Sequence, residues 1–341
     1  MRGSPPQIGP MKIRYPAIVT AATAALLLTG CASGSPAAAP APTASAGGAG
    51  AYPVTVQNCD TSVTLEAAPE RIVTIKSTTT ELLLALGLAD RIVGSAFLDG
   101  PLPASLEKAG ADLNVISDFV PGHEAVLALT PDFVYGGWES NFSADGVGER
   151  TALAGLGIGS YVSPAACKGE AMPDPLTFDT VFAEIDEAGA LFGVPDAAAE
   201  LVAEQEAELA ALTPAAGDTT ALWYSSGTDT PYVGAGIGSP QMIMDAAGLT
   251  NIFADVQDTW TSAGWESVVA ANPSVIVLVD ATWNTADSKI ANLKANPATA
   301  GLDAVLNDRY IVVPFAATEA GIRNVEAAGS IIDQLSELNS K

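Results

Sequence analysis

The side chains of this sequence that are best suited to ligand chemistry are a few cations near predicted strand ends. Lys76, Ser77 and Thr78 follow an apolar run and begin a helical pattern. A helix N-terminus offers free N–H groups and a favourable dipole, so these residues indicate a site for a phosphate or carboxylate. Arg323 lies in a similar place after a later apolar run. We expect Lys76 and Arg323 to contact an anionic ligand; an ordinary helix cap with a solvated lysine is the alternative for the triplet.

Aromatic residues form a second group with binding chemistry. The chain has five Trp, and most of them lie near predicted strand ends or in loops that face the same side. Such a set favours a flat or bulky ligand, although core packing is the alternative for any single ring. The candidate ligand-binding residues of this group are Trp138, Trp223, Tyr224, Tyr232, Trp260 and Trp283, and Glu139, next to Trp138, is a further candidate.

Catalytic and metal-dependent classes fit the sequence poorly. His123 is the one histidine, and the sequence has no Gly-x-Ser-x-Gly elbow, which argues against a Ser-His-Asp hydrolase. A single histidine also excludes Zn and Mn carriers that use several His ligands. The glycine-rich segment 233–238 lacks the spacing of a nucleotide-binding loop. We expect no catalytic residue, no metal and no cofactor, while haem ligation through a Tyr stays open.

The N-terminal residues predict export and lipid attachment. A basic start precedes a short apolar run at 17–28, which cannot span a bilayer core of about 30 Å. The Leu-Thr-Gly-Cys sequence that ends at Cys31 resembles the lipobox of bacterial lipoproteins. It implies a lipid on Cys31 and a mature protein held at the outer face of the cell membrane. The more conventional signal begins at Met11 rather than Met1.

The composition limits the partners of the folded part. Segment 32–51 is almost entirely Ala, Ser, Gly, Pro and Thr, which indicates a flexible tether. The roughly 290 residues from Tyr52 onward exceed one typical core and favour two lobes. The chain has 14 Lys and Arg against 39 Asp and Glu, a formal net charge of −25. So acidic a surface argues against nucleic acid and anionic lipid as partners, and leaves the anchor as the predicted membrane contact.

Two cysteines remain once Cys31 is assigned to the anchor. In an oxidising compartment, Cys59 and Cys167 are expected to pair. Their bond would close a loop of about 108 residues and contribute roughly 4–5 kcal/mol in the chain-entropy description. Two buried free thiols are the alternative.

Short apolar runs alternate with helical patterns along the folded part, which is typical of parallel βαβ units. Thr78 and Glu81 have the spacing of a capping box for a helix that stops at Gly87. Segment 177–212 is helical almost throughout, with one interruption at 193–195, and suits a long helix packed along the body. The predicted strands are 71–75, 91–96, 133–135, 159–162, 221–224, 275–279 and 310–313.

One pattern occurs in both halves of the chain. In the first half, Glu124 precedes a two-turn helix that Pro131 ends, and a strand then leads to Trp138. The second half repeats this order from Glu266 to Trp283. The repeat implies two similar lobes, although helix–Pro–strand units are common in any α/β protein.

With these patterns, the chain from Tyr52 onward resembles the periplasmic-binding family that serves siderophore and cobalamin ABC importers. The segment 71–88 and the paired Glu-to-Pro units carry the resemblance. It implies two Rossmann-like α/β lobes, a single long bridging helix and a ligand cleft between the lobes. The expected divisions are a signal peptide at 1–31, a tether at 32–51, a first lobe at 52–176, a bridging segment at 177–213 and a second lobe at 214–341.

The resemblance also implies partners. In that family one Glu of each lobe contacts the permease, and by position these are Glu124 and Glu266; a favourable charge at a helix N-terminus is the alternative role. The implied protein is a lipid-anchored, monomeric, non-enzymatic carrier. Segments 52–59, 137–143 and 223–227 are similar to an actinobacterial branch that carries a deazaflavin coenzyme precursor. Ferric siderophores, cobalamin and haem are alternative ligands; a surface receptor or adhesion module and a surface hydrolase are alternative classes.

Overall fold

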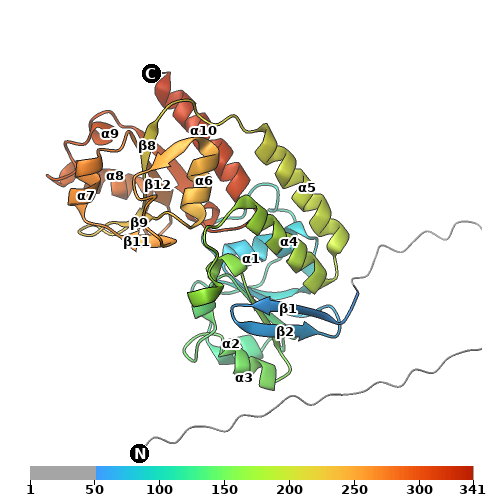
Figure 1. Ribbon diagram of the computed structural model, residues 1–341. Helices are drawn as coiled ribbons and strands as arrows, with labels where there is room; N and C mark the ends of the chain where they lie inside the picture. The colour runs from blue at the N-terminus through green and yellow to red at the C-terminus, as the bar shows by residue number, and fades with distance from the viewer. Residues whose placement is uncertain (1–50, 341) are drawn as a thin grey trace, which may run out of the picture. The chain divides into compact units, whose positions relative to one another are not determined.

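The computed structural model describes residues 51–340 (Figure 1). The predicted signal peptide, the lipid-attachment residue Cys31 and the tether up to residue 50 therefore lie outside the described residues. Among the helices of residues 51–340, none combines the length and the apolar character needed to cross a membrane.

The first lobe is built on a five-stranded sheet in which every neighbouring pair is parallel. Its central strand is buried along its whole length, because helices cover both faces. Ile72 packs in one apolar cluster with α1 and with the later helix α4 (Phe178–Phe192), while Val73 and Ile75 pack in another with α2 and α3. Across the sheet the strands are β5 (Val115–Ser117), β4 (Ile92–Ala96), β3 (Ile72–Ile75), β6 (Phe133–Gly136) and β7 (Gly159–Val162); the first three helices are α1 (Ser77–Ala85), α2 (His123–Leu127) and α3 (Arg150–Gly155).

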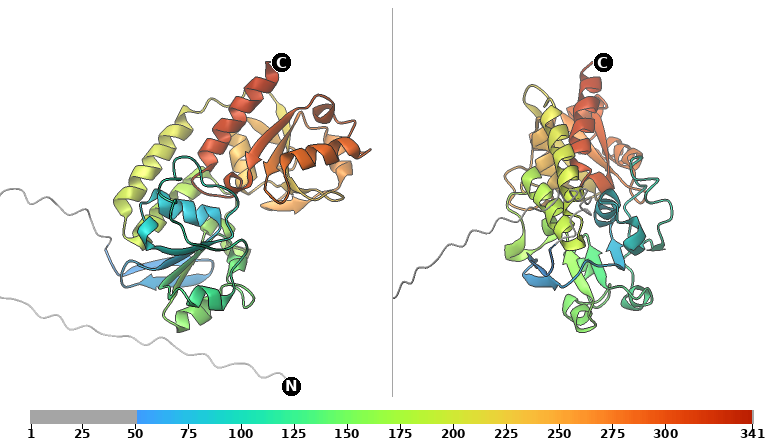
Figure 2. Two further views of the ribbon diagram at one scale, coloured as in Figure 1. Left: turned by 180° about the vertical axis from the view of Figure 1, so that it is seen from behind. Right: turned by 90° about the vertical axis from the view of Figure 1, so that its right-hand side faces the viewer.

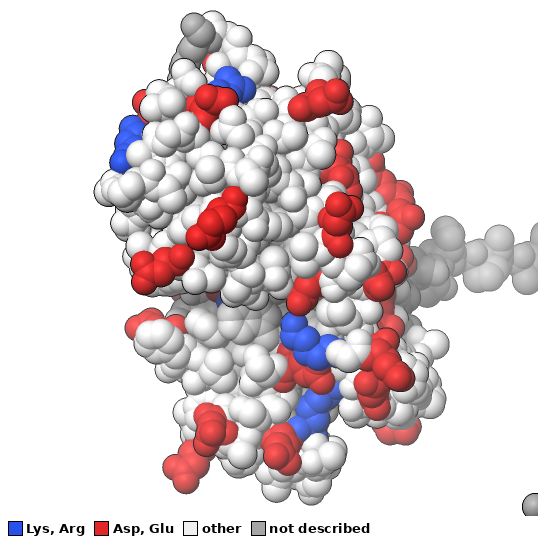
Figure 3. Space-filling model, turned by 60° about the vertical axis from the view of Figure 1, so that its left-hand side comes forward, with Lys and Arg blue, Asp and Glu red and all other residues white. Residues whose placement is uncertain are grey.

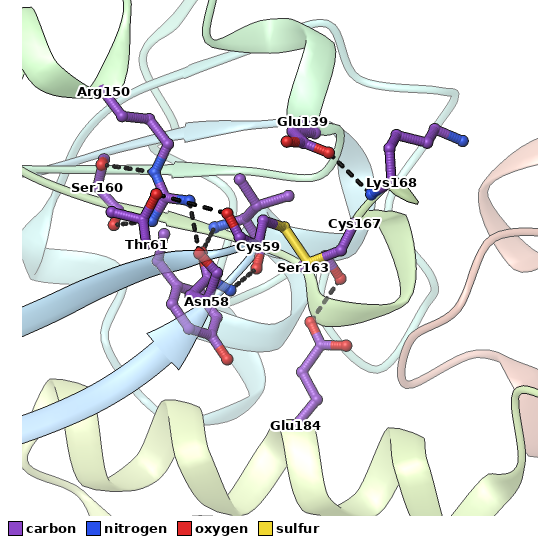
Figure 4. Close-up of a disulfide and its surroundings, with 12 residues drawn as sticks. Asn58, Cys59, Thr61, Glu139, Arg150, Ser160, Ser163, Cys167, Lys168 and Glu184 are labelled. Atoms are coloured by element: carbon purple, nitrogen blue, oxygen red, sulfur yellow. Dashed lines mark hydrogen bonds between the residues drawn. A yellow bond between two sulfur atoms is a disulfide. The ribbon is translucent and has the colours of Figure 1, made fainter. Parts of the chain in front are cut away.

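An antiparallel hairpin, β1 (Val54–Asn58) and β2 (Thr61–Leu65), precedes this sheet and packs beside β7. The expected disulfide is present: Cys59 in the hairpin turn is bonded to Cys167, with a Cα–Cα distance of 5.1 Å (Figure 4). Asn58 strengthens the same junction, since its side chain bonds the backbone N–H and C=O of Val162 at 2.8 and 2.7 Å. The hairpin is thereby fastened to the edge of the sheet.

The second lobe is built on a separate six-stranded sheet. Its core strands are parallel, and two short antiparallel strands extend one edge. Across the sheet the strands are β11 (Trp260–Ser262), β9 (Tyr232–Gly234), β8 (Thr219–Ser226), β12 (Val275–Asp280) and β13 (Tyr310–Pro314), and β10 (Leu249–Asn251) also pairs with β8. The helices are α6 (Ser239–Ala247), α7 (Trp265–Ala271), α8 (Ala286–Ala295), α9 (Asp303–Leu306) and α10 (Asn324–Asn339); Figure 2 shows both lobes from two further sides.

All seven predicted strands are confirmed to within two residues at each end, and their mutual pairings are parallel. The repeated unit is confirmed as well. In each lobe a short helix (α2 or α7) begins after a glycine cap, carries its Glu in the first turn and is followed by Pro and a buried strand (β6 or β12). The sequence missed the hairpin and the three-residue strands, which have too few residues for a periodic signal.

The segment 177–212 is helical with a break at 193–195, as predicted, but it supplies two helices rather than the single bridging helix that the resemblance implies. The segment forms two helices, α4 (Phe178–Phe192) and α5 (Pro195–Ala211), which pack side by side (Figure 1). The chain reverses at Gly193, a left-handed C-cap with φ 74°, and Pro195 begins the next helix. Helix α4 covers the first lobe, and α5 leads on to β8 and contacts α10 of the second lobe.

Candidate ligand-binding site

The carboxyl ends of the strands in both sheets lead into loops that enclose a small pocket. Parallel α/β sheets place ligands at this edge. The pocket has a volume of about 90 Å³, and both lobes line it. Its wall from the first lobe and the connecting segment consists of Thr78, Gly137, Trp138, Ser163, Ala165, Ala166, Lys168 and Leu176; its wall from the second lobe consists of Gly238, Ser239, Thr259, Trp260, Glu319 and Ala320.

Lys76 lies directly behind this pocket, and its side chain is fully buried. The ammonium forms an ion pair with Asp99 and lies 3.7 Å from a carboxylate oxygen of Glu319. Aromatic rings enclose it, because Nζ is 3.8 Å from the centre of the Trp138 ring and 4.9 Å from that of Phe315. A charge removed from water needs such partners, so Lys76 serves as the centre of a buried polar cluster in this structure.

Asp99 occupies the position that the Lys76-Ser77-Thr78 pattern predicts for a ligand's anionic group. One carboxylate oxygen accepts a hydrogen bond from the backbone N–H of Ser77 at 3.2 Å, and the other pairs with Lys76. The hydroxyl of Ser77 in turn accepts the backbone N–H of Asp99 at 2.8 Å. The helix N-terminus does hold an anion, as its dipole favours, but the anion belongs to the protein.

Glu319 connects the two lobes across the pocket. Its carboxylate accepts the indole N–H of Trp138 at 2.8 Å and faces Lys76, while its side chain stays 15% exposed. Burial raises the pKa of Glu319, and the Lys76 ammonium opposes that shift. A carboxyl group that contacts residues of the first lobe thus lies at the wall of the pocket.

Arg323 makes the second polar contact between the lobes. Its guanidinium donates to both carboxylate oxygens of Glu81 at 2.5 and 2.6 Å and to the carbonyl of Pro101 at 2.9 Å. Burial raises the pKa of Glu81, and the hydrogen bond and charge of Arg323 lower this pKa.

The predicted capping box of Thr78 and Glu81 is wrong, because the side chain of Glu81 binds Arg323 instead. Helix α1 begins one residue before Thr78 and has no side-chain cap.

The candidate aromatic residues divide into a pocket group and a core group. Trp138 and Trp260 line the pocket from opposite lobes, and Tyr232 stacks on Trp260 with a centroid distance of 5.9 Å. Trp223 and Tyr224 lie inside the second sheet, where both side chains are fully buried; packing took precedence over ligand contact at these two positions. The structure brings the first group together and excludes the second from the pocket wall.

Trp283 lies outside the pocket wall, is 65% exposed and packs edge-on against Phe315. On the first lobe, Phe97 packs edge-on against Trp138 and lies beside Phe119, which is 73% exposed. Aromatic rings with open faces thus follow the strand ends of both lobes.

One wall of the pocket is the segment from Ser163 to Lys168. The disulfide of Cys167 fixes it to the hairpin, and Glu139 accepts the backbone N–H of Lys168 at 2.8 Å (Figure 4). Glu139, a predicted ligand contact, supports this wall from behind. Lys168 is an exposed residue of this wall.

Sequence reasoning missed Phe97, Asp99, Phe315 and Glu319. Each follows a strand closely, Phe97 and Asp99 after β4 and the other two after β13. Their positions just after predicted strands could therefore have marked them as candidate site residues. What the sequence did not reveal is that loops from two strands far apart in the chain meet around one lysine.

Glu124 and Glu266 are exposed in the first turns of α2 and α7. Their role at a permease stays a prediction. His123, next to Glu124, donates from Nδ1 to the carbonyl of Val147 at 2.7 Å, as expected for a structural histidine. Within residues 51–340, His, Cys, Asp and Glu form no group of three or more that could hold a metal ion.

With the fold and the pocket described, the family can be assigned. A family model described as periplasmic binding protein matches residues 72–317, from the first strand of the first sheet to just past the last strand of the second. The chain belongs to the periplasmic binding protein family. The two lobes, the pocket between their loops and the paired helix–Pro–strand units are thus features of a periplasmic binding protein.

Relatives of this binding protein include a protein named for cobalamin binding and two solved binding-protein structures. A cobalamin-binding protein of Halobacterium salinarum is 28% identical over 254 residues, which cover 70% of this chain and 62% of that protein. The chain thus spans less than two thirds of that relative's length. A periplasmic binding protein from Veillonella parvula shares 26% identity with a TM-score of 0.72, covering 83% of this chain and 97% of that one. An ABC-type Fe3+-hydroxamate transport system from Saccharomonospora viridis shares 28% identity with a TM-score of 0.71, covering 84% and 99%.

Proposed function

We propose that this chain is the substrate-binding component of an ABC importer, which captures a small ligand between its lobes and presents it to a permease. The observation that carries the proposal is the pocket that loops of both lobes enclose at the carboxyl ends of their strands. Membership of the periplasmic binding protein family supports the same function. The proposed protein binds its ligand without transforming it.

The ligand we propose is a planar ring system, with a deazaflavin coenzyme precursor as the leading candidate. Trp138 and Trp260 offer aromatic surface from opposite walls, and the hydroxyls of Thr78, Ser163 and Ser239 supply polar contacts. The similarity of three segments to the deazaflavin-carrying branch supports this choice.

Corrinoids and ferric hydroxamates are the second candidate, which the names of the relatives favour. The pocket volume of about 90 Å³ is below the range of about 300–1,000 Å³ for drug-sized ligands. A deazaflavin and a corrinoid would therefore both require the lobes to move apart, the corrinoid further because it is larger. Haem fits less well, since the pocket wall of the described chain has no Tyr, His, Met or Cys side chain to ligate iron.

Delivery requires two features beyond the pocket. We propose that Glu124 and Glu266, one on each lobe, contact basic residues of the permease, and that a lipid on Cys31 holds the protein at the outer face of the membrane. Their exposure on equivalent helices supports the first assignment. The lipobox resemblance supports the second.

Native mass spectrometry of the protein from its own cells, with absorbance spectra, tests the ligand. A co-purifying planar ring compound is expected, and a corrinoid or ferric chelate would favour the second candidate.

Uptake by cells that carry Glu124→Ala with Glu266→Ala tests delivery, with Glu200→Ala on α5 as an exposed control. Lost uptake with intact ligand affinity supports transport. Unchanged uptake would instead favour a surface receptor or adhesion module.

A further inference from the structure

The buried cations around the pocket are all matched by carboxylates. Lys76 is fully buried and faces Asp99 and Glu319. Arg323 is 11% exposed at its side chain and is held by both oxygens of Glu81. Two cations thus face three carboxylates, so this cluster holds no surplus positive charge for a ligand.

The start of helix α1 is filled as well. Its first backbone N–H, that of Ser77, donates to Asp99, whose side chain is only 4% exposed. An anionic group of a ligand would have to displace this carboxylate from the helix N-terminus and from Lys76 at the same time. Glu319 at the pocket wall would repel it further whenever its carboxyl group is ionised, and in neither protonation state does it attract an anion by charge.

The remaining polar groups of the wall are uncharged, apart from one. Hydroxyls of Thr78, Ser163, Ser239 and Thr259 line the pocket. Lys168 lines it too, but its side chain is exposed and therefore solvated. Hydroxyl groups and a hydrogen-bond acceptor such as Glu319 suit a ligand that donates N–H or O–H groups.

We infer that the pocket selects an uncharged or cationic ligand and that Asp99 excludes ligands with a phosphate or a free carboxylate beside α1. This inference rests on the proposed function, in which the pocket binds a small planar molecule. It reverses the expectation from the Lys76-Ser77-Thr78 pattern, because the protein supplies its own anion to that pattern.

Riboflavin and flavin mononucleotide form a suitable pair of probes, since they share one ring system and differ by a phosphate. Titration followed by quenching of tryptophan fluorescence measures both affinities. The inference predicts that the phosphate weakens binding by at least about tenfold. Equal affinity, or tighter binding of the phosphorylated probe, would overturn it.

Variants at Asp99 should weaken or remove the preference for riboflavin over flavin mononucleotide. Asp99→Ser removes the competing carboxylate, and Asp99→Asn does so with the least change in shape. We expect either variant to gain affinity for flavin mononucleotide by about tenfold and to keep riboflavin affinity within about twofold. Lys168→Met tests the exposed cation of the pocket wall. The matched control is Lys108→Met, an exposed lysine outside that wall, which should leave both flavin affinities unchanged. Selective loss of phosphate binding in Lys168→Met would show that this exposed cation, not Asp99, sets the preference.

Inorganic phosphate tests the charge preference without any ring ligand. Equilibrium dialysis should show no phosphate bound by the wild-type protein and measurable binding by Asp99→Ser. Phosphate that binds the wild-type protein and is lost in Lys76→Met would overturn the inference. If neither flavin binds, the planar-ligand part of the proposed function fails, while the phosphate measurement still decides the role of Asp99.

Discussion

At the scale of single residues, Glu184 on α4 makes the folding stability of the protein depend on pH. Its carboxylate is buried and accepts hydrogen bonds from Tyr135 at 2.9 Å and from Ser163, which also lines the pocket, at 2.5 Å. Burial raises the pKa of Glu184 from 4.5 to about 7, against the effect of both hydrogen bonds. The folded state thus binds the proton more tightly than the unfolded state.

This shift predicts the direction of a pH effect. The stabilisation is complete below the unfolded pKa and is lost as pH rises through the folded pKa, so Glu184 should lower stability between about pH 5 and about pH 8. Glu184→Gln should reduce the fall in the free energy of unfolding between these pH values by up to about 3 kcal/mol. Thermal unfolding at both pH values measures it, with the exposed Glu200→Gln as control. Equal pH dependence in wild type and Glu184→Gln would contradict the assignment.

At the scale of elements, the reversal between α4 and α5 depends on Gly193. Its φ of 74° suits glycine, and an added Cβ would lie 3.1 Å from the hydroxyl of Tyr52 and 3.2 Å from Cβ of Ala68. Gly193→Ala should therefore lower the free energy of unfolding by about 1–2 kcal/mol. Gly155→Ala at the end of α3 meets open space and should be neutral, which makes it the matched control in urea unfolding. A Gly193→Ala variant as stable as the control would contradict this account of the turn.

The disulfide is the second feature at this scale. Removal of the bond by Cys59→Ser with Cys167→Ser should lower the free energy of unfolding by up to about 4–5 kcal/mol, because the closed loop is long. Urea unfolding measures the loss. Ligand affinity should fall as well, since the segment that Cys167 anchors forms a pocket wall. Unchanged affinity in a folded variant would show that Glu139 alone positions that wall.

Elements with a strong local signal could be predicted from the sequence. The runs that became β3 and β12 are β-branched and buried, and the Glu-to-Pro units mark the helices before β6 and β12. The break at Gly193-Val194-Pro195 was visible, but not that the chain reverses there, because only packing between α4 and α5 decides this. Likewise the cation Lys76 was identified, whereas its partner Asp99 was not, since the pairing depends on how two loops meet in space.

At the scale of the whole molecule, Arg323 and Glu81 hold the two lobes in contact. Loss of one partner from a buried ion pair leaves the other charge uncompensated, at a cost of about 3–5 kcal/mol. Arg323→Met should therefore destabilise the protein strongly in urea unfolding. Addition of Glu81→Leu should restore most of that loss, because no buried charge then remains unpaired. A double variant as unstable as the single one would show that the contact serves packing rather than charge balance.

The acidity of the molecule agrees with its proposed place outside the cell. Acidic side chains are spread over the face shown in Figure 3. The formal net charge of −25 suits the proposed contact with a basic permease surface and disfavours contact with anionic lipid.

The central claim is that a ligand is held between loops of both lobes. A crystal structure of the protein with the compound that native mass spectrometry identifies tests it most directly. The account predicts a ring in contact with Trp138 of the first lobe and Trp260 of the second, with no anionic group against Ser77 or Lys76. A ligand bound to one lobe alone, or away from both tryptophans, would contradict it.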